Sequence, residues 1–500
     1  MLTIFIIIFV LVGYTFLTSS YLRAYKYPVL GFLSVCLAIM MVSIWGQNIT
    51  TFEKIGLLSL TTLEIIAVPF LLYFLIAEKS VPKIVALIIG GGLIILAQEL
   101  ADYGLKDGNL LVQVKDEAKG ENLSIYKDFE LNESYRFDPV DGTMTDLDDY
   151  ICLSFKQYSP RKLKQVISVL QSSEKVIWVE VDDDLQLDMP ELKLVASNRS
   201  SKNKAFYNDP LVSKQWGFDA IGLMDAFEWL SEIGYQPKKK AKVFVLDTGI
   251  NGEHEDLKDN YKVLHPKDQY DANGHGTHCA GTISAINNNG KGIASFNYNN
   301  ACIDLSAIAV LNQNGMGKES TIIKGIIEAV DSGADVISMS LGGLANPFKQ
   351  KAYNEALAYA AKHNVLVVAA AGNSNANAKY YLPTSNDYVF SVASVNQNLQ
   401  KSSFSNYIQD VSKGIAAPGE QIMSTDEQGS YKLANGTSMA APFVTGLLAL
   451  MRTMDPSITA EDAHAILKEY GIKTKQTKQT GSLIQVKPVL EHLYHQQYDQ

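Results

Sequence analysis

The amino-acid sequence predicts an α/β fold for the C-terminal part, with a mostly parallel sheet flanked by helices. A four-helix transmembrane region and a small α+β domain are expected before it. Three patterns predict this order: long apolar runs in residues 1–100, alternating strand-like runs in 101–187, and short apolar strands alternating with amphipathic helices in 208–496. Residues 188–207, rich in Ser, Asn and Lys, are expected to form an exposed linker.

Composition limits the possible functions. The chain has 500 residues and is 47% hydrophobic, which predicts more than one folded unit and an unusually apolar segment. The net charge of −10, without clustered Lys and Arg, argues against nucleic acid as a partner. The cysteines are too few and too scattered for a disulfide framework, so we expect free thiols at Cys36, Cys152, Cys279 and Cys302.

The N-terminal apolar runs have the length of membrane spans, about 20 residues each. They occupy residues 2–20, 28–45, 55–76 and 81–97. No charged residue precedes Arg23, so the first run lacks the basic start of a cleaved signal peptide. The basic first and third loops should face the cytoplasm, which puts the rest of the chain on the extracytoplasmic side of a multi-pass integral membrane protein. If the fourth and shortest run were only peripheral, the rest of the chain would be cytoplasmic.

One acidic residue falls inside a predicted span. Glu64 lies in the middle of the third run. A functional group facing protein or water and a helix-packing hydrogen bond both agree with this position.

The segment after the spans predicts a small α+β domain. Its strand-like runs are residues 110–114, 124–131, 150–155 and 176–181, and a helical run covers 161–170. The C-terminal strands are expected at 242–246, 305–311, 335–339, 365–370 and 389–395. Apolar stripes between them predict covering helices, and this alternation is typical of a parallel sheet whose sites collect at the carboxyl ends of its strands.

Four side chains stand out at the ends of these elements. Asp247 directly follows an apolar strand, and His275 lies in Gly-His-Gly-Thr-His-Cys-Ala-Gly, where small residues let a helix pack closely. Asn373 ends a run of alanines after another strand, and Ser438 lies in Asn-Gly-Thr-Ser-Met-Ala-Ala-Pro ahead of an apolar helix. Each alone could be an ordinary cap or core residue, so the combination carries the argument.

Together these residues supply the parts that serine acyl transfer requires. Ser438 would attack a carbonyl, and His275 would take its proton and return it to the leaving amine. Asp247 would orient His275 and stabilise the imidazolium. Asn373 and the Ser438 backbone N–H would donate to the oxyanion.

The motifs VLDTG, GHGTHCAGT, AAAGN and NGTSMAAP resemble those of the subtilisin-like serine proteases, and the Asp, His, Ser order matches that family. The HGTHC and SSFSNY forms are most similar to the proteinase K branch. The resemblance implies a subtilisin-like serine endopeptidase that needs no cofactor for its chemistry. It assigns Asp247, His275 and Ser438 to the triad and Asn373 to the oxyanion site.

The resemblance also implies two edges that pair with an extended substrate peptide. They are assigned to Ser340, Leu341, Gly342 and Gly343 on one side, and to Gly315 and Gly317 on the other. The α+β domain is similar to the propeptide of these proteases, which folds the enzyme and inhibits it as a zymogen. Self-cleavage is then expected in the linker between Leu187 and Asn208.

Calcium is a further implication of the resemblance. Asp209, Asp256 and Asn288, the last within Asn287 to Asn289, would correspond to a structural calcium site. The Asn-Asn-Asn-Gly sequence is equally consistent with a simple turn.

Other functions remain as alternatives. A nucleophile-elbow hydrolase needs its acid and histidine after the serine, which this order excludes. His275, His278 and Cys279 could be zinc ligands. The chain could also be an inactive or permanently inhibited protease scaffold that binds or senses at the membrane. In a further alternative the membrane bundle is a transporter and the protease its accessory, and Glu64 is the only residue that favours it.

Overall fold

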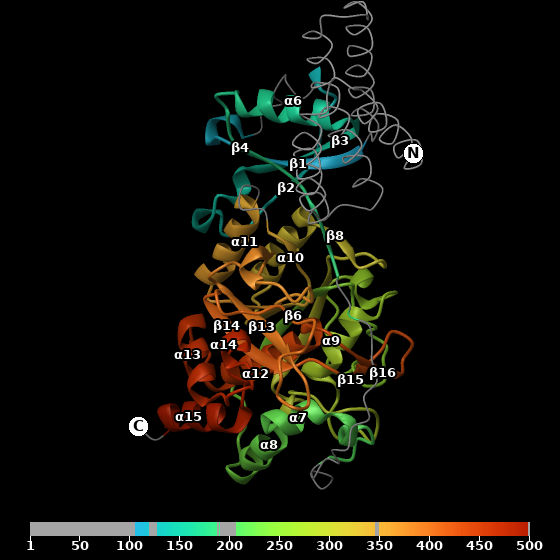
Figure 1. Cartoon of the computed structure of the whole chain (residues 1–500), viewed down its shortest axis with the longest axis vertical. Coiled ribbons are helices and arrows are strands. Elements are labelled where there is room, and N and C mark those ends of the chain that lie inside the picture. Colours follow the sequence, from blue (N-terminus) through green and yellow to red (C-terminus); the bar gives the residue numbers. More distant parts are fainter. Residues whose placement is uncertain (1–105, 120–127, 188–189, 191–206, 346–349, 499–500) are drawn as a thin grey trace, which may run out of the picture. The chain divides into compact units, whose positions relative to one another are not determined.

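The structure is a computed structural model that describes residues 106–119, 128–187, 190, 207–345 and 350–498 (Figure 1). The chain divides into two compact units, residues 1–107 with 156–169, and residues 108–155 with 170–500. The four predicted spans and Glu64 lie outside the described residues. Among the helices that are described, none is both long and apolar enough to cross a membrane. The membrane region therefore stays a prediction.

The described part of the first unit contains most of helix α6, Pro160–Gln171, where the sequence predicts a helix over 161–170. Its start is set by Ser159. The Ser159 side-chain oxygen accepts a hydrogen bond from the backbone N–H of Lys162 at 3.2 Å, and its carbonyl accepts from Leu163 at 2.9 Å. These are the bonds of a serine N-cap.

The N-terminal sheet has the strand order β2-β3-β1-β4. Its strands are β1 Lys106–Val114, β2 Asn132–Arg136, β3 Tyr150–Tyr158 and β4 Val176–Val181. Strands β1 and β4 are antiparallel, with Val112 opposite Val179. The strand predicted over 124–131 is wrong in its described part, because residues 128–131 are not extended and β2 begins at Asn132. Strand β2 is a mostly exposed edge strand, so it has almost no apolar periodicity to detect.

The C-terminal sheet is parallel throughout, in the order β14-β13-β11-β9-β6-β7. Its strands are β6 Ala241–Asp247, β7 Ile303–Ala309, β9 Val336–Met339, β11 Leu366–Ala370, β13 Val389–Val395 and β14 Lys413–Pro418. Five of them lie where the sequence predicts strands. The sixth, β14, was missed because its sequence Lys-Gly-Ile-Ala-Ala-Pro contains a glycine and a proline, which weaken the strand pattern.

Helices cover both faces of this sheet. The principal ones are α9 His275–Ser284, α10 Glu319–Asp331, α11 Lys351–Lys362 and α12 Thr437–Met454. Val243 and Val245 of β6 share a buried cluster with α9 and α12, whereas Phe244 and Leu246 share another with α10 and α11. Side chains alternate along a strand, so Asp247 faces the side of α9 and α12.

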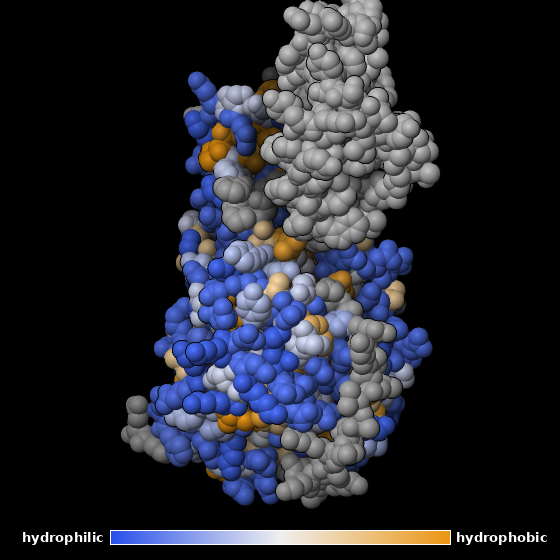
Figure 2. All heavy atoms as spheres, in the orientation of Figure 1, coloured by the Kyte–Doolittle hydropathy of each residue, from blue (hydrophilic) through white to orange (hydrophobic). Residues whose placement is uncertain are grey.

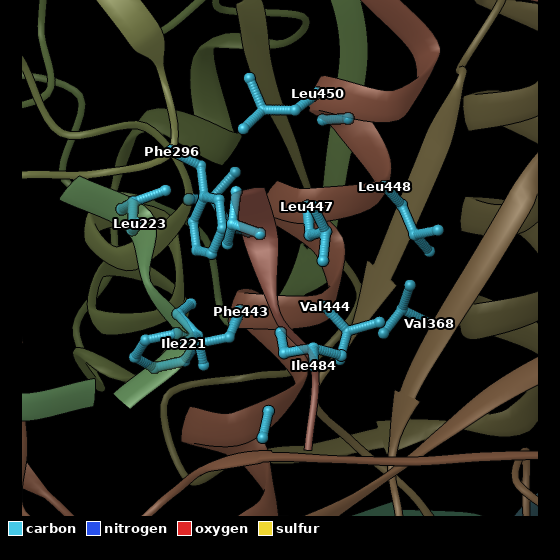
Figure 3. Packing of buried hydrophobic residues seen from close by; sticks show 14 of the residues in the cluster. Ile221, Leu223, Phe296, Val368, Phe443, Val444, Leu447, Leu448, Leu450 and Ile484 are labelled. Atoms are coloured by element: carbon cyan, nitrogen blue, oxygen red, sulfur yellow. The ribbon is translucent and has the colours of Figure 1, made fainter. Parts of the chain in front are cut away.

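Helix α12 is buried along its whole length. Figure 3 shows Val444 and Leu448 of α12 beside Val368 of β11, while Phe443 points toward Ile221 of α7. Large apolar side chains fill this core, and the surface seen in Figure 2 is mainly hydrophilic. The site helices are thus held by packing on several sides, which fixes their position.

Smaller elements complete the peptidase part. Its other helices are α7 Trp216–Ile221, α8 Leu223–Glu232, α13 Ala460–Tyr470, α14 Thr477–Thr480 and α15 Val486–Tyr498. Two two-stranded pairs lie within it, β10 Gly343–Leu344 with β12 Tyr381–Leu382 and β15 Ile422–Thr425 with β16 Tyr431–Ala434. A third pair joins β5 Asp184–Gln186, which precedes the linker, to β8 Met316–Lys318 of the peptidase part.

The N-terminal sheet packs on α10 and α11. Leu111, Tyr150 and Cys152 of that sheet belong to the same buried cluster as the two helices. The carboxylate of Glu180 accepts hydrogen bonds from the first two backbone N–H groups of α11, both at 3.1 Å. Asp182 accepts from the backbone N–H of Ser320 in α10 at 2.8 Å. The N-terminal sheet therefore supplies caps that the N-cap residues of these two helices do not provide with their own side chains.

Candidate active site

Asp247 and His275 are brought together by the end of β6 and the start of α9. The Nδ1 atom of His275 lies 2.8 Å from Oδ1 and 2.9 Å from Oδ2 of Asp247, and both side chains are buried. An ionised carboxylate only accepts hydrogen bonds, so Nδ1 carries the proton and the neutral ring has its lone pair on Nε2. The backbone N–H of Thr248 donates to Asp247 Oδ1 at 2.8 Å and holds the carboxylate in place.

Close packing of α9 on the turn after β6 depends on Gly276. A Cβ atom at this position would overlap the carbonyl oxygen of Gly249 and would lie 3.1 Å from the Cβ of Asp247. A larger residue would push α9 away from β6. The glycine in His-Gly-Thr-His thus sets the distance between the histidine and the aspartate.

Ser438 is the second residue of α12 and is 4% exposed. Four residues later, Pro442 has no N–H to donate to the Ser438 carbonyl. That carbonyl instead accepts from Ser340 Oγ at 2.9 Å and from Cys279 Sγ at 3.5 Å. The proline therefore lets neighbouring elements bind the backbone of Ser438, which fixes the residue against α9.

The Ser438 hydroxyl donates to the carbonyl oxygen of Ser340 at 3.1 Å. His275 Nε2 is buried and has no hydrogen-bond partner among the described residues. Cys279 lies between Ser438 and the Asp247–His275 pair. Its Sγ is within 4.8 Å of an Asp247 carboxylate oxygen and of a His275 ring nitrogen, and it also contacts the Ser438 carbonyl. The Ser438 hydroxyl must rotate away from Ser340 before it can donate to His275. Hydrogen bonds between a catalytic serine and its histidine are often long when no substrate is bound.

Asn373 follows β11 and is half-buried. Its side-chain oxygen accepts from the backbone N–H and the hydroxyl of Thr437, at 2.8 and 2.9 Å. The amide nitrogen is thus the end of Asn373 that can donate. It lies 3.7 Å from where a Cβ on Gly436 would stand. Gly436 has φ 153°, so a side chain there would be strained as well as close to this nitrogen.

The predicted substrate edges surround residues 184–187 of the chain itself. Strand β5 pairs antiparallel with β8, with Leu185 opposite Gly317, and the Leu187 N–H donates to the Gly315 carbonyl at 2.9 Å. A Cβ on Gly343 would lie 2.5 Å from the Leu185 side chain. The structure thus brings Gly315, Gly317 and Gly343 around one extended segment.

The remaining residues of the second edge have other contacts. Ser340 bonds to Ser438, as described above, and the Leu341 side chain is in the buried cluster that also holds Leu185. Gly342 lies against the Leu382 carbonyl, next to the β10–β12 pair.

The predicted calcium ligands come together only in part. Asp256 is fully buried, burial raises its pKa to about 7, and its oxygens accept from Asn289 Nδ2 at 2.7 Å and Ile293 N–H at 2.9 Å. Asp209 accepts from the backbone N–H groups of Asn288 and Asn289. The Asn288 side-chain oxygen accepts from the backbone N–H of Asn208 at 3.1 Å, so it is already hydrogen-bonded. Carboxylate and amide oxygens are the ligands that calcium prefers, and a bound cation would offset the burial that raises the pKa of Asp256.

The structure does not bring His275, His278 and Cys279 together as zinc ligands. His278 Nε2 faces the carbonyls of Ile422 and Lys432 at 3.1 and 3.2 Å, and burial lowers the pKa of His278 to about 3. The only cluster of three possible ligands among the described residues is Asp247, His275 and Cys279, without His278. Burial raises the pKa of the Cys279 thiol well above its usual value, so it is not a ready thiolate ligand. Cys152, Cys279 and Cys302 are free, as predicted, and all three are buried.

Three residues at the site were not singled out from the sequence. Thr248 and Thr437 hold Asp247 and Asn373, and Asp271 accepts bonds at the start of α9. Thr248 and Thr437 lie inside recognised motifs, directly beside Asp247 and Ser438, which is the signal that could have found them. Asp271 lies four residues before His275, and nothing local marks it.

The C-terminal part matches the model of the subtilase family over residues 238–484. The chain is 39% identical to thermitase of Thermoactinomyces vulgaris over 259 residues, which are 50% of this chain and 86% of thermitase. The chain belongs to the subtilase family. It is also 39% identical to subtilisin DY of Bacillus licheniformis over 232 residues, 44% of this chain and 79% of that protein.

A solved structure with the same fold is that of a protease from Pseudoalteromonas arctica PAMC 21717. It is 30% identical, with a TM-score of 0.51, over 58% of this chain and 100% of that one. This subtilase is therefore a serine endopeptidase with a subtilisin-like α/β fold, and it acts on peptide or protein substrates. The proteinase K-like branch stays a prediction, since the curated relatives named here are thermitase and a subtilisin.

Proposed function

We propose that this endopeptidase hydrolyses peptide bonds through the triad Asp247, His275 and Ser438, and that it is a membrane-anchored zymogen that processes itself. The bond from His275 Nδ1 to both oxygens of Asp247 carries the proposal. It leaves Nε2 as the basic nitrogen, and Cys279 Sγ, which lies near His275, also contacts the Ser438 carbonyl.

In the first half of the reaction, the Ser438 hydroxyl leaves Ser340 and attacks the substrate carbonyl while its proton moves to His275 Nε2. The tetrahedral intermediate collapses, the C–N bond breaks, and the same proton passes to the leaving amine. In the second half, water attacks the acyl-enzyme and gives its proton to His275. The ester bond to Ser438 then breaks, the carboxylic acid product leaves, and the proton returns from His275 to the Ser438 oxygen. Asp247 holds the ring and stabilises the imidazolium throughout.

The oxyanion would accept hydrogen bonds from the Asn373 amide and the Ser438 backbone N–H. The clamp of Thr437 on the Asn373 oxygen supports this role, because it fixes which end of the amide is the donor. In subtilisin, removal of one such donor lowers kcat by about 10²–10³.

The small α+β domain before the linker, residues 101–187, would act as an inhibitory propeptide. Two observations support this: residues 184–187 pair with the proposed substrate edge, and Glu180 and Asp182 cap helices of the peptidase part. A substrate-like segment that ends at Leu187 leads directly into the linker 188–207, where we place the self-cleavage. Before cleavage the segment blocks the cleft, so the full chain is a zymogen.

Membrane anchorage and calcium complete the proposal. The four apolar runs support a multi-pass anchor with the catalytic part on the extracytoplasmic side. Catalysis in this family needs no cofactor, and calcium binding is common in it. Asp256, with Asn289 and Asp209 beside it, would hold a structural calcium ion, whose charge would stabilise the buried carboxylate.

A permanently inhibited scaffold is the second candidate. Its support is the blocked edge at Gly315 and Gly317 and the hydrogen bond that holds the Ser438 hydroxyl on Ser340. In that case the chain would bind or sense at the membrane without turnover.

The deciding experiment compares the full chain with Ser438→Ala and with Ser457→Ala, which changes an exposed serine outside the site. Each is probed for size on a denaturing gel and for labelling by a fluorophosphonate. We expect wild type and Ser457→Ala to be labelled and cleaved within residues 188–207, and Ser438→Ala to stay full length and unlabelled. If all three stay full length and unlabelled, the inhibited scaffold replaces the active enzyme.

A further inference from the structure

Asp271 is a buried carboxylate close to the triad that the proposed mechanism does not use. It is 8% exposed and lies on the loop that leads into α9. None of the ion pairs formed by the described residues includes it. A buried charge without a partner cation persists only if hydrogen bonds compensate for its lost hydration.

Five hydrogen bonds provide this compensation. Asp271 Oδ1 accepts from the backbone N–H groups of Asn273 and Gly274, at 3.0 and 2.8 Å, and from the Thr248 hydroxyl at 2.9 Å. Oδ2 accepts from the backbone N–H and the hydroxyl of Thr277, at 2.9 and 2.7 Å. Both oxygens are saturated, so the side chain has one orientation.

These bonds connect the two elements that carry the catalytic pair. Thr248 follows Asp247 directly, and Thr277 lies in the first turn of α9, two residues after His275. Thr248 adds a second connection, because its hydroxyl oxygen accepts from the Gly276 N–H at 3.1 Å. Asp271 therefore ties the residue next to the aspartate to the helix turn that carries the histidine.

We propose that Asp271 is a positioning residue that sets the geometry of the Asp247–His275 pair by holding Thr248 and the first turn of α9 together. It touches neither the substrate edges nor Ser438, so it acts through the pair. The inference rests on the proposed triad. Loss of the Asp271 charge should lower the rate of the chemical step and leave substrate binding largely unchanged.

The main test variant is Asp271→Asn. An asparagine has the same shape but only one acceptor oxygen, so the Thr277 N–H loses its acceptor. The matched control is Asp268→Asn. Asp268 is buried too and lies in the same loop region, but its side chain accepts from the Ala309 N–H and has no hydrogen bond to Thr248 or α9. Thr248→Val tests the connection itself, since it removes the hydroxyl and keeps the shape.

Each variant is made in the full chain and measured for kcat and KM on a peptide p-nitroanilide, for the rate of fluorophosphonate labelling per titrated active site, and for melting temperature. We expect Asp271→Asn to lose roughly 10- to 100-fold in kcat and in labelling rate, since a misplacement near 1 Å costs about that much. KM should stay within about twofold of wild type, and Asp268→Asn should match wild-type kcat. Asp271→Asn and Thr248→Val should be non-additive in the double variant.

A wild-type labelling rate per active site in Asp271→Asn overturns the inference, and so does an equal kcat loss in Asp268→Asn or a raised KM with unchanged kcat. If Asp271→Asn does not fold, Thr248→Val decides, and wild-type kcat in that variant overturns the inference. A wild-type chain that is not labelled at all overturns the proposed function first, and the inference with it.

Discussion

The two faces of the parallel sheet differ in where their helices obtain caps. On the face with the triad, Thr248 and Asp271 accept from the first turn of α9, and both belong to the peptidase part. On the opposite face, Asp182, which directly follows β4, accepts from the first turn of α10, and Glu180 of β4 accepts from the first turn of α11. The catalytic face is thus complete in itself, whereas the other face depends on the N-terminal sheet.

This difference predicts what happens when the N-terminal sheet leaves. Once the sheet has left, the first N–H groups of α10 and α11 exchange carboxylate acceptors for water, so the starts of these two helices should be weakened first. Helix α10 directly follows β8, which contains the substrate-edge glycine Gly317. Removal of the N-terminal sheet should therefore loosen this edge of the cleft and leave the Asp247–His275 pair intact.

The largest effect should come from the catalytic face. Asp247→Asn keeps the shape of the side chain but lets His275 take the wrong tautomer, and we expect kcat to fall by about 10⁴. The melting temperature should change little, because α9 keeps its own caps. The measurement is kcat per titrated active site beside a thermal melt. A loss below tenfold would contradict the role of Asp247 in the triad.

The next effect concerns the buried charge of Asp256. Burial raises the pKa of Asp256 from 3.8 to about 7, so between these values the folded protein holds a proton that the unfolded chain releases. The free energy of unfolding should therefore fall as pH rises through this window and level off above about 7. The measurement is melting temperature against pH in EDTA, in the inactive Ser438→Ala background.

Two controls sharpen the prediction for Asp256. Asp256→Asn should flatten the pH dependence, because no proton is then released at this position. Calcium should reduce it in the parent chain if the ion binds there, since the ion stabilises the carboxylate. An equal slope in Asp256→Asn and its parent would show that other groups cause the pH dependence.

A smaller effect is expected on the opposite face. Glu180→Ala leaves the first two N–H groups of α11 and the Trp178 indole N–H without their acceptor. In the uncleaved Ser438→Ala chain we expect a loss of roughly 1–3 kcal/mol in the free energy of unfolding, measured by denaturant titration. Glu174→Ala, at an exposed position, is the control. Equal stability of the two variants would argue against capping by Glu180.

The smallest effect is expected from a self-contained cap. Thr459 accepts from the backbone N–H of Asp462 in α13 at 3.1 Å. Thr459→Ala should lower the free energy of unfolding by about 1 kcal/mol in a denaturant titration. The loss should be equal in the full chain and in the peptidase part after the α+β domain has been cleaved off. The Glu180→Ala cost should appear only in the uncleaved chain, because Glu180 leaves with the N-terminal sheet. A Thr459→Ala cost that falls after the cleavage would contradict a cap that the peptidase part supplies by itself.

Much of the fold was predictable because local patterns determine it. The inner strands β6, β9, β11 and β13 are mostly apolar runs, and their burial on both faces explains why they are so clear. Strand β7 lies at the sheet edge, and its sequence Ile-Asp-Leu-Ser-Ala-Ile-Ala still alternates enough to predict a strand. Strands β2 and β14 lie at sheet edges and lack this pattern, so they were misplaced or missed. The predicted membrane spans and the linker lie almost entirely outside the described residues and stay predictions.

The sequence by itself determined which residues carry the chemistry. Asp247, His275, Asn373 and Ser438 lie in motifs whose glycines and small residues allow close packing, and this information is local. The tertiary structure decided how they are held: the support of Asp271 for α9, the contacts of the Ser438 carbonyl that Pro442 frees, and the pairing of residues 184–187 with β8. The contacts of the Ser438 carbonyl and the pairing with β8 join segments far apart in the chain, and Asp271 reaches back 23 residues to Thr248. No local periodicity encodes such partners, because they meet only once the sheet has assembled.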